Sequence, residues 1–458
     1  MSSKFSSLKL PKPFLDNIAS LGFESMTPIQ AQSLPVILTD KDVIAQAKTG
    51  SGKTVAFGVG LLWNIKTSSK NPSSLVLCPT RELAEQISVE LRKLARRTPN
   101  LKILNLTGGI PIGPQIRSLE HGAHVIIGTP GRVQDHIRKG SLSLSSVNKL
   151  VLDEADRMLD MGFLDDIKNI VSHCPESKQT LLFSATYPES IGEVSEQFQN
   201  DPIHIKIDTK HETSKISQTF YSCSHEDKLK TLKALLYKHQ IHKAVAFCQT
   251  KADCDILAHD LSKNDIVARA IHGDMEQRER EEVLTLFANG SLNVLVATDV
   301  AARGIDIKDL PVVINYELSK DPQVHTHRIG RTGRAGSKGL AISLVSPREE
   351  RRFKLIQEAN PHLKLERGET IKSQFNYLPK PEMLTLTILA GKRNKLRPGD
   401  ILGALTQGAS IQSKDVGKIN IFPVRSYVAV RRSLANKALH GLRKAKIKNR
   451  DLKLFIVN

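Results

Sequence analysis

The stretch KLVLDEADRMLDMGF, residues 149–163, sets an apolar run directly against a cluster of carboxylates. Residues 150–152 show no polar alternation, which is typical of a strand covered on both faces of a parallel sheet. The end of this predicted strand carries Asp153, Glu154 and Asp156. Like charges at this spacing repel one another, so the cluster indicates that a cation binds at the end of the strand.

Apolar runs of the same kind recur through the first 208 residues, separated by helix-length segments such as TRELAEQISVELRKLARR. The runs are DVIAQA, SSLVLCPT, LKILNLTGG, AHVIIGTP, KLVLDEAD and QTLLFSAT. Strands that alternate with helices predict a parallel α/β sheet, and ligands bind such sheets at the carboxyl ends of the strands. The polar clusters CPTREL, GTPGR, DEAD and SAT all follow predicted strands, so the sequence predicts one site at this edge.

The same alternation resumes after a polar segment, which predicts a second α/β domain. Its predicted strands are KAVAFCQT, VARAIHG, NVLVATD, PVVINYEL and GLAISLVS. The end of the chain follows a β-α-β-β-α-β order that is common in small RNA-binding modules. We therefore predict an α/β domain at 1–208, a linker at 209–218, a second α/β domain at 219–365, a linker at 366–379 and a small α+β domain at 380–458.

The charge of the chain indicates a polyanionic partner. Its net charge is +19, and residues 380–458 hold 17 Lys and Arg against 4 Asp and Glu. So large an excess in one short domain favours nucleic acid over a merely solvated surface. No apolar run approaches the roughly 20 residues that span a bilayer, and the N-terminus lacks the apolar core of a signal peptide. The five cysteines form no CxxC pair, which is typical of reduced thiols in a cytosolic protein.

A phosphate-binding loop follows the first predicted strand. In AQAKTGSGKT, Gly50 and Gly52 allow backbone N–H groups to approach phosphate oxygens at the start of a helix. Lys53 can reach the β- and γ-phosphates, and Thr54 can ligate Mg²⁺. The usual pattern begins with glycine, whereas this one begins with Ala47. The sequence therefore predicts a nucleoside triphosphate site made of Ala47, Lys48, Thr49, Gly50, Ser51, Gly52, Lys53 and Thr54.

This loop explains why carboxylates gather at the end of a neighbouring strand. Asp153 would face the same phosphates and hold Mg²⁺ through its water shell. Glu154 would orient or deprotonate the attacking water, and Asp156 is expected to fix contacts between domains. An acidic helix N-terminus would explain one carboxylate, but not three beside a phosphate-binding loop.

The order of these motifs resembles that of the DEAD-box RNA helicases. AQAKTGSGKT, PTREL, TPGR, DEAD and SAT appear in the first domain, and HGDMEQRER, ATDVAARGID and HRIGRTGRAG in the second. The tail segment GKRNKLRPGDILGALT resembles the RNA-binding domain of the bacterial DbpA subfamily. The resemblance implies two RecA-like lobes, RNA-dependent hydrolysis of ATP with Mg²⁺, and local unwinding of RNA.

For the nucleotide, the resemblance implies that Gln30 bonds the edge of adenine while Phe5 stacks on the base. Asp306 resembles the ribose contact of the family. Arg331 and Arg334, both in HRIGRTGR, resemble the arginines of the second lobe that touch the γ-phosphate and serve hydrolysis. The residues implied to couple hydrolysis to RNA binding are Asp156, Ser184, Thr186 and His327.

For RNA, the resemblance implies contacts with phosphate and 2′-hydroxyl groups that do not read base sequence. The residues implied in the lobes are Arg81, Gly109, Thr129, Arg132, Thr250, Gly273, Gln277, Arg280 and Thr298. In the tail, the predicted strand SYVAVRR offers only Tyr427 where RNA-recognition modules carry several stacking rings. We therefore expect the tail to bind through basic residues, namely Lys392, Arg393, Lys395, Arg397, Arg431 and Arg432.

The subfamily resemblance implies that the tail targets a hairpin of 23S ribosomal RNA. The expected role is then assembly of the large ribosomal subunit by a monomer in the bacterial cytoplasm, with no membrane partner. Three alternatives stay open: an ATP-gated RNA clamp that hydrolyses ATP without unwinding, a general RNA helicase without preference for ribosomal RNA, and a DNA translocase built from similar lobes.

Overall fold

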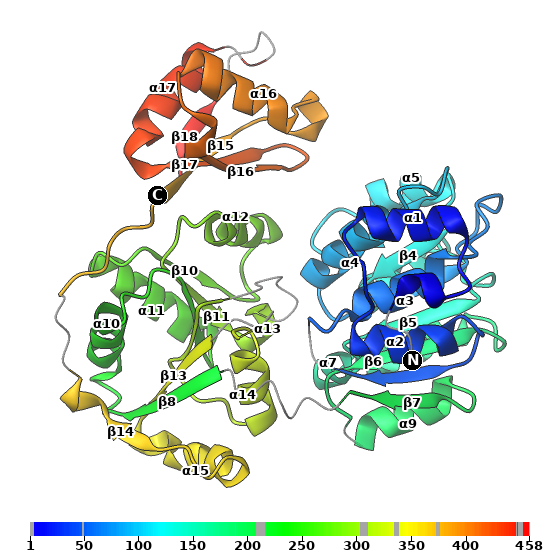
Figure 1. Ribbon diagram of the computed structural model, residues 1–458, viewed down its shortest axis with the longest axis horizontal. Helices are drawn as coiled ribbons and strands as arrows, with labels where there is room; N and C mark the ends of the chain where they lie inside the picture. Colours follow the sequence, from blue (N-terminus) through cyan, green and yellow to red (C-terminus); the bar gives the residue numbers. More distant parts are fainter. Residues whose placement is uncertain are drawn as a thin grey trace. The chain divides into compact units, whose positions relative to one another are not determined.

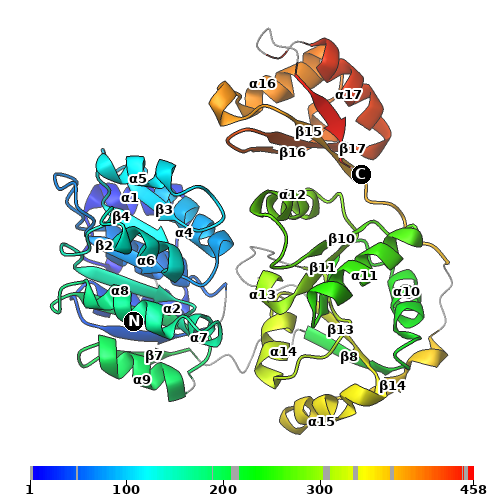
Figure 2. The ribbon, with the colours of Figure 1, turned by 180° about the vertical axis from the view of Figure 1, so that it is seen from behind.

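The computed structural model describes residues 4–47, 50–187, 189–207, 216–302, 310–333, 339–371, 376–445, 447 and 452–457. Its described residues divide into two compact units, the first formed by residues up to 207 and the second by residues from 216 onward. In Figures 1 and 2 the first unit runs from blue to green, and the second from green to red. Each unit is described by itself.

The first unit is built on a parallel sheet with strand order β3-β4-β2-β5-β6-β1-β7 in the described part of the chain. The strands are β1 (Val43–Gln46), β2 (Ser74–Leu77), β3 (Ile103–Leu106), β4 (Val125–Gly128), β5 (Lys149–Asp153), β6 (Gln179–Ser184) and β7 (Ile203–Lys206). The six apolar runs of the sequence form β1 to β6, which confirms the predicted parallel α/β sheet. Strand β7 was not predicted, because the alternating residues IHIK at a sheet edge lack the continuous apolar run of a central strand.

Helices cover both faces of this sheet (Figure 1). They are α1 (Lys12–Ser20), α2 (Pro28–Ile37), α3 (Lys53–Leu62), α4 (Arg81–Leu94), α5 (Gly113–Glu120), α6 (Pro130–Arg138), α7 (Ala155–Asp160), α8 (Leu164–Ser172) and α9 (Glu189–Phe198). Successive residues of β5 enter opposite cores: Val151 packs with α2, α3 and α4, whereas Leu150 and Leu152 pack with α6, α7 and α8. The strand that ends at the carboxylates is therefore buried on both faces, as the sequence predicted.

The second unit contains a further parallel sheet, ordered β10-β11-β9-β12-β13-β8-β14 among the described residues. Its strands are β8 (Ile216–Ser222), β9 (Ala244–Cys248), β10 (Ala268–Ile271), β11 (Val294–Thr298), β12 (Val312–Asn315), β13 (Gly339–Val345) and β14 (Leu365–Arg367). Its helices are α10 (Lys228–Lys238), α11 (Lys251–Lys263), α12 (Gln277–Ala288), α13 (Asp299–Ala302), α14 (Pro322–Ile329) and α15 (Glu350–Ala359).

The predicted linkers overlap the ends of two strands in this unit. Strand β8 begins at Ile216, inside the predicted linker 209–218, and β14 ends at Arg367, just inside the linker 366–379. These two strands pair with each other, and the partner rather than the local sequence makes each of them extended. Residues 208–215 and 372–375 lie outside the described residues.

The second unit also holds the small C-terminal domain. Its elements are β15 (Met383–Ile388), α16 (Pro398–Gly403), β16 (Val416–Ile421), β17 (Ser426–Arg431), α17 (Ala435–Lys444) and β18 (Leu454–Ile456). The strands form an antiparallel sheet in the order β16-β17-β15-β18. The predicted β-α-β-β-α-β order is confirmed. One face of the sheet has its own apolar core, in which Leu386 and Val428 pack with Ile401 and Leu442 of the helices.

Within the described residues, no helix combines the length and the apolar character needed to cross a bilayer. All five cysteines are free, and four of them are buried. Burial raises the pKa of Cys78 well above its ordinary value, with the carboxylates of Asp153 and Glu154 adding to the rise. The thiol next to the carboxylate cluster therefore stays protonated and acts as a small apolar side chain.

Candidate nucleotide- and RNA-binding site

The phosphate-binding loop lies between β1 and α3, as predicted. Gly50 and Gly52 adopt left-handed backbone angles, with φ of 85° and 94°, which other residues rarely tolerate. A Cβ atom on Gly52 would overlap the amide of Gln30, so a side chain there would displace that residue. Helix α3 begins at Lys53 with its N-terminus at the loop. Lys48 and Thr49, also predicted to belong to the loop, lie outside the described residues.

Gln30, the predicted adenine contact, holds the loop from the side of α2. Its Nε2 donates to the carbonyl of Gly52 at 3.0 Å, and its Oε1 accepts from the backbone N–H of Thr27 at 2.9 Å. A carboxamide has a second N–H and a second lone pair, so these bonds leave capacity for a base edge. Phe5, the predicted stacking residue, is only 3% exposed and packs in the first lobe's core. The adenine roles of both residues stay predictions.

The carboxylate cluster is buried at the end of β5. Burial raises the pKa of Asp153 to about 7, Lys53 opposes this rise, and Glu154 adds to it. Lys53 is buried as well, and its Nζ donates to the carbonyl of Ala47 at 2.7 Å. Glu154 has a left-handed backbone with φ of 52°, and its carboxylate pairs with the buried guanidinium of Arg157 at 3.1 Å. The pairing fixes where the Glu154 carboxylate lies.

These residues fit a nucleoside triphosphate with a divalent cation. The hydroxyl of Ser51 is buried and has no hydrogen-bond partner among the described residues, and the two glycines keep side chains away from the loop. Asp153 is a buried carboxylate whose raised pKa shows that the nearby cationic side chain compensates its charge only in part. A divalent cation bound to the phosphates would supply the missing positive charge. Thr54, at the start of α3, is half-buried beside them.

Asp156 connects the carboxylate cluster to the SAT motif. Its Oδ2 accepts from the backbone N–H of Thr186 at 3.0 Å and from the Thr186 hydroxyl at 2.7 Å. Burial would raise the pKa of Asp156, but the bonds from Thr186 lower it below its ordinary value. Ser184 is buried at the end of β6. Asp156, predicted to serve contacts between domains, therefore makes its described contacts inside the first lobe.

The predicted RNA residues of the first lobe gather around one loop, residues 107–112. Arg81 begins α4, and a Cβ atom on Gly109 would overlap its guanidinium, which therefore lies against the glycine. Thr129 is the N-cap of α6, and Arg132 in the first turn of that helix donates to the carbonyl of Ile110 at 3.0 Å. Residues from three strand ends thus meet at one place.

The predicted RNA residues of the second lobe follow β9, β10 and β11. Thr250 caps α11 and accepts from the N–H of Asp253 at 3.1 Å, and Thr298 ends β11. Gly273 is exposed after β10, while Gln277 and Arg280 lie in the first turn of α12. Because neighbouring parallel strands end at the same edge, the structure brings these residues to one side of the sheet.

The HRIGRTGR motif contains an arginine that the sequence analysis did not single out. Arg328 is 2% exposed and holds the Asp299 carboxylate with two bonds of 2.6 and 2.8 Å. Its Nη1 donates to Asn315 and to the carbonyl of Glu317. His327 and Arg331 flank it on α14 and just beyond. Asp306 and Arg334 lie outside the described residues.

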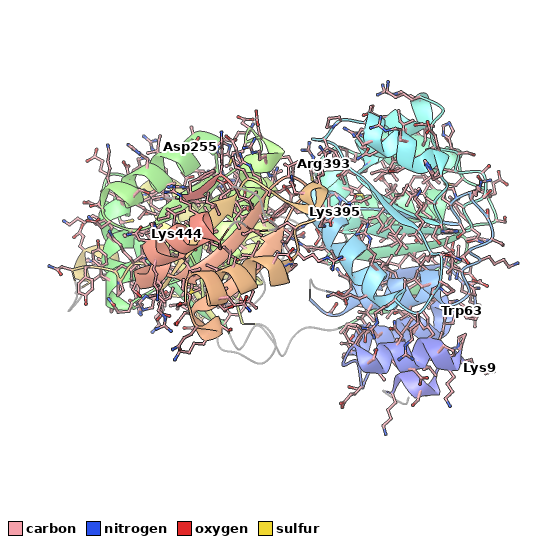
Figure 3. All side chains as sticks on the ribbon, turned by 90° about the horizontal axis from the view of Figure 1, so that it is seen from above. Lys9, Trp63, Asp255, Arg393, Lys395 and Lys444 are labelled. Carbon is pink, nitrogen blue, oxygen red and sulfur yellow. The ribbon has the colours of Figure 1, made fainter. Side chains whose placement is uncertain are left out.

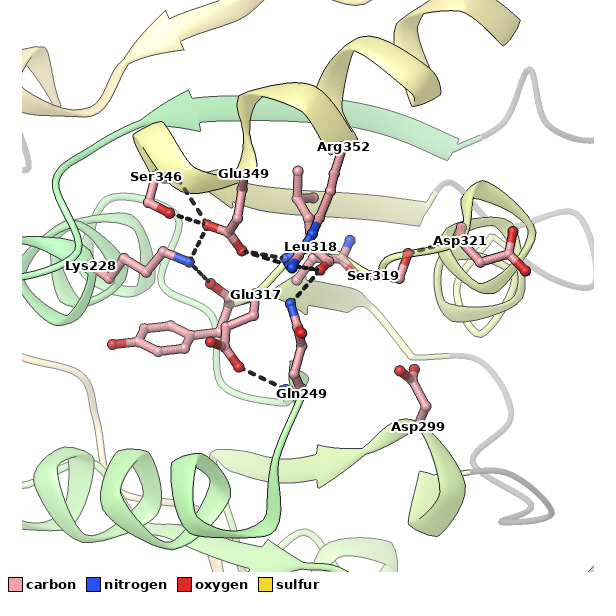
Figure 4. Close-up of polar contacts among 12 residues, drawn as sticks. Lys228, Gln249, Asp299, Glu317, Leu318, Ser319, Asp321, Ser346, Glu349 and Arg352 are labelled. Atoms are coloured by element: carbon pink, nitrogen blue, oxygen red, sulfur yellow. Dashed lines mark hydrogen bonds and ion pairs between the residues drawn. The ribbon is translucent and has the colours of Figure 1, made fainter. Parts of the chain in front are cut away.

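A second set of polar residues that the sequence did not reveal supports the turn before Thr250 (Figure 4). The N–H of Gln249 donates to the carboxylate of Glu317 at 2.7 Å, and its side chain donates to the carbonyl of Leu318 at 2.9 Å. The N–H of Leu318 in turn donates to Glu349 at 2.9 Å. These bonds join β9, β12 and α15 over long sequence distances, which no local pattern reports.

The basic residues of the C-terminal domain divide into exposed and internally bonded ones. Lys392, Arg393 and Lys395 are exposed on a loop whose backbone is tied to the β16–β17 turn by bonds of 2.9 Å (Figure 3). Arg397, also exposed, caps α16. Arg431 pairs with Asp415 at 2.8 Å, and Arg432 donates to the carbonyls of Pro381 and Met383. The three basic residues of the loop are therefore all exposed, whereas Arg431 and Arg432 are held by a carboxylate and by backbone carbonyls.

The sheet face that carries Tyr427 and Thr385 contacts the second lobe. Tyr427 is 2% exposed and donates to Glu282 of α12 at 3.0 Å, and Thr385 bonds Ser291 at 2.8 Å. Burial, and then the charge of Glu282, raise the pKa of Tyr427 to about 12. Arg425 lies 3.6 Å from the same carboxylate. The expectation that bases do not stack on this sheet agrees with a face that is already occupied.

Three families match consecutive parts of the chain. Residues 27–194 match the DEAD/DEAH box helicase family, residues 227–336 match the helicase conserved C-terminal domain, and residues 385–455 match the DbpA RNA binding domain. The first match includes β1 to β6, the second includes β9 to β12, and the third includes most of the C-terminal domain.

Individual proteins give the same result. The chain is 50% identical over 454 residues to the ATP-dependent RNA helicase DbpA of Escherichia coli strain K12, covering 99% of both chains. It is 44% identical over 359 residues to the DEAD-box ATP-dependent RNA helicase CshA of Bacillus subtilis strain 168, covering 78% of this chain and 72% of CshA. The structure of S. cerevisiae Dbp5 bound to RNA and ADP BeF3 matches with a TM-score of 0.73 and 31% identity, over 80% of this chain and 95% of Dbp5. The chain therefore belongs to the DEAD-box ATP-dependent RNA helicases, and within them to the DbpA type.

Proposed function

We propose that this helicase acts on 23S ribosomal RNA during assembly of the large ribosomal subunit in the bacterial cytoplasm, and that residues 380–458 direct it to a hairpin of that RNA. The observation that carries the proposal is a C-terminal domain with its own core that holds +13 of the net charge and matches the DbpA RNA binding domain. The DbpA relative covers 99% of this chain, whereas CshA covers 78%.

At the nucleotide, each proposed role follows from where a group lies. The N–H groups of the glycine loop and Lys53 bind the phosphates, while Thr54 and Asp153 hold Mg²⁺, largely through water. The ion, when bound, neutralises charge that develops on the phosphates. Glu154 orients the attacking water or takes its proton, and the 3.1 Å pair with Arg157 keeps its carboxylate in place. Gln30 and Phe5 are proposed to select adenine.

RNA binding and hydrolysis are proposed to depend on each other through strand-end contacts. The Asp156–Thr186 bonds connect the catalytic carboxylates to the SAT motif, so a shift of one motif strains the other. The residues proposed to complete the nucleotide site from the second lobe are Asp306, His327, Arg331 and Arg334, on the resemblance of their motifs. ATP and RNA stabilise the same closed state, because coupling requires both ligands to bind that state better.

The test compares RNA-stimulated ATP hydrolysis on a 23S hairpin and on an unrelated hairpin of equal length. We expect the full chain to need much less of the 23S hairpin for half-maximal stimulation. Joint replacement of Lys392, Arg393 and Lys395 by Ala should remove most of this preference and leave the maximal rate unchanged. The matched control replaces Lys238, Lys263 and Lys320, basic residues of the second lobe outside the proposed RNA contacts.

Varying the salt concentration in the same assay distinguishes specific recognition of the hairpin from nonspecific attraction between charges. Counterion release weakens binding to both hairpins alike, since it does not depend on base sequence. Contacts to base edges or to RNA shape favour one hairpin over the other by roughly 1–3 kcal/mol each. The ratio of the half-maximal concentrations for the two hairpins should therefore persist as the salt concentration rises. Equal half-maximal concentrations for the two hairpins at every salt concentration would make the protein a general RNA helicase and reject the proposal.

A further inference from the structure

A buried polar cluster lies next to the TPGR motif. It consists of Gln115 on α5, His136 on α6 and Ser141 just after α6. Gln115 is 6% exposed and His136 is fully buried. Buried polar groups are costly unless they are bonded, so the cluster needs a reason. The cluster contacts Arg132 of the motif through Gln115.

Arg132 directs its guanidinium into the protein. Nη1 donates to Gln115 Oε1 at 2.9 Å, Nη2 donates to the carbonyl of Ile110 at 3.0 Å, and Nε lies 3.7 Å from Asp135. Its side chain is only 12% exposed. An arginine that grips phosphate presents its planar fork to the ligand. Here each nitrogen of that fork already faces a protein acceptor.

Gln115 joins Arg132 to the glycine loop. Its Oε1 accepts from Arg132 and lies 3.0 Å from His136 Nε2, and its Nε2 donates to the carbonyl of Thr107 at 3.1 Å. Burial, and then the charge of Arg132, lower the pKa of His136 below its ordinary value, so the neutral ring can donate one N–H to Gln115. The other ring nitrogen lies 2.8 Å from the Ser141 hydroxyl. All the polar atoms that face Arg132 are thereby fixed.

The loop that this cluster holds is the one against which the Arg81 guanidinium lies. Thr107 and Ile110, whose carbonyls are bonded, bracket the Gly108–Gly109 pair. Gly109 has a left-handed backbone with φ of 77°, and a Cβ atom there would overlap the Arg81 guanidinium. Gly108 is also close, since its Cβ would lie 3.3 Å from Arg81 Nη2. The position of the glycine pair therefore sets the position of Arg81.

We propose that Arg132, Gln115 and His136 are positioning residues that fix the 107–110 loop, and that the RNA backbone is bound by the exposed loop and Arg81 rather than by Arg132. The inference rests on the proposed RNA binding by the first lobe. It departs from the expectation that Arg132 itself contacts RNA. Arg132 acts on RNA through the loop, so its geometry matters and its charge does not.

The first test uses the full chain, a short oligouridine, Mg²⁺ and a non-hydrolysable ATP analogue, with RNA affinity measured over a series of salt concentrations. Arg132→Lys should lose about as much affinity as Arg132→Ala, roughly tenfold, because one ammonium group cannot bond both Gln115 and Ile110. The slope of log affinity against log salt should stay parental for both. Arg81→Ala should lower that slope by about 0.7, the value for one phosphate contact on a single strand.

Gln115→Ala supplies an uncharged variant at the centre of the cluster. We expect it to weaken oligouridine binding by about the same factor as Arg132→Lys with a parental salt slope, and to raise the RNA concentration for half-maximal ATP hydrolysis more than it lowers the maximal rate. Arg138→Ala is the matched control: this arginine lies on the same helix, pairs with Asp135 and is 70% exposed. It should bind RNA as the parent does. Nucleotide affinity and melting temperature check that each variant folds.

Two results would overturn the inference. One is parental affinity in Arg132→Lys together with a slope lowered by about 0.7 in Arg132→Ala, which is the behaviour of a direct phosphate contact. The other is parental affinity in Gln115→Ala. If Gln115→Ala does not fold, the Arg132→Lys comparison decides alone. Failure of the parent itself to bind oligouridine would instead reject the proposed RNA binding by the lobes, and loss of hairpin preference alone would reject only the ribosomal target.

Discussion

At the scale of single residues, the three carboxylates of the DEAD motif have three different environments. Asp153 is buried with a pKa raised to about 7, Glu154 pairs with Arg157, and Asp156 is bonded by Thr186. The sequence predicted their number and their place at a strand end. It did not predict Arg157 as a partner, although opposite charges three residues apart could have indicated the pair.

Substitutions of Lys53 and Glu154 are expected to affect different steps, ATP binding and ATP hydrolysis respectively. Lys53→Ala should weaken ATP binding, because its Nζ lies at the loop, where we propose that it pairs with phosphate in the ground state. Glu154→Gln should keep ATP affinity near the parental value and lower single-turnover hydrolysis by about 10²–10⁴, the usual contribution of a general base. Nucleotide titration and single-turnover kinetics on both variants measure the two effects. Hydrolysis by Glu154→Gln at the parental rate would remove that residue from the chemistry.

At the scale of elements, the predictability of each strand follows from how apolar its own residues are. Strands β1 to β6 appear in the sequence as apolar runs such as SLVL, although β3 lies at an edge of the sheet. Strands β7, β8 and β14 were not predicted, because segments with alternating or polar residues, such as IHIK, are made extended by the strands they pair with. Arg328 and Gln249 were missed for a related reason: their partners come from other strands, which spacing along the chain does not reveal.

The ion pair between α10 and the residue that precedes α15 is expected to stabilise the second lobe strongly against unfolding. Lys228 and Glu349 are 1% and 6% exposed and lie 2.6 Å apart (Figure 4). Glu349→Ala leaves a buried ammonium without its partner and should lower the free energy of unfolding by about 3–5 kcal/mol. Urea unfolding measures the loss. Arg352→Ala, whose guanidinium lies 4.0 Å from Glu349 and is more exposed, is the control and should lose less than about 1 kcal/mol. Equal losses of unfolding free energy in the two variants would contradict a stabilising role of the Lys228–Glu349 pair.

The same pair gives the second lobe a dependence on pH. Burial would raise the pKa of Glu349, but Lys228 and the bonds from Lys228 and Ser346 lower it below 4.5. A carboxyl whose pKa is lower in the folded state stabilises the fold above its ordinary pKa, and this stability is lost as pH falls through the folded value. Unfolding free energy should therefore decline below about pH 4.5 less steeply in Glu349→Gln than in the parent. Equally steep declines of the unfolding free energy in the variant and the parent would show that Glu349 does not cause the pH dependence.

At the scale of the whole molecule, the C-terminal domain has one occupied face and one exposed loop. Tyr427 and Thr385 are buried against α12 and the residues that follow it, so that sheet face belongs to the second lobe. The basic loop of Lys392, Arg393 and Lys395 is exposed. The account therefore places RNA recognition by this domain on the loop, where charge rather than stacking rings dominates.

Substitutions of Tyr427 test whether RNA binds the sheet face or the basic loop. Tyr427→Phe removes the donor to Glu282 and should lower the free energy of unfolding by about 1 kcal/mol. Tyr427→Leu removes the aromatic ring as well, yet should leave affinity for the 23S hairpin within about twofold of the parent, because a base stacked on the ring would be worth roughly 1–3 kcal/mol. Filter binding and urea unfolding measure the two quantities. A tenfold loss of hairpin affinity in Tyr427→Leu would place a base on the sheet.

The most direct test of the whole account is strand displacement by the full chain. The substrate is a short RNA duplex joined to the 23S hairpin, compared with the same duplex joined to an unrelated hairpin, each with ATP and with its non-hydrolysable analogue. The account predicts ATP-dependent displacement that is saturated at much lower protein concentration when the 23S hairpin is present. Hydrolysis of ATP without displacement would show an RNA clamp, and equal displacement of both substrates would show a helicase without a ribosomal target; either result would contradict the account.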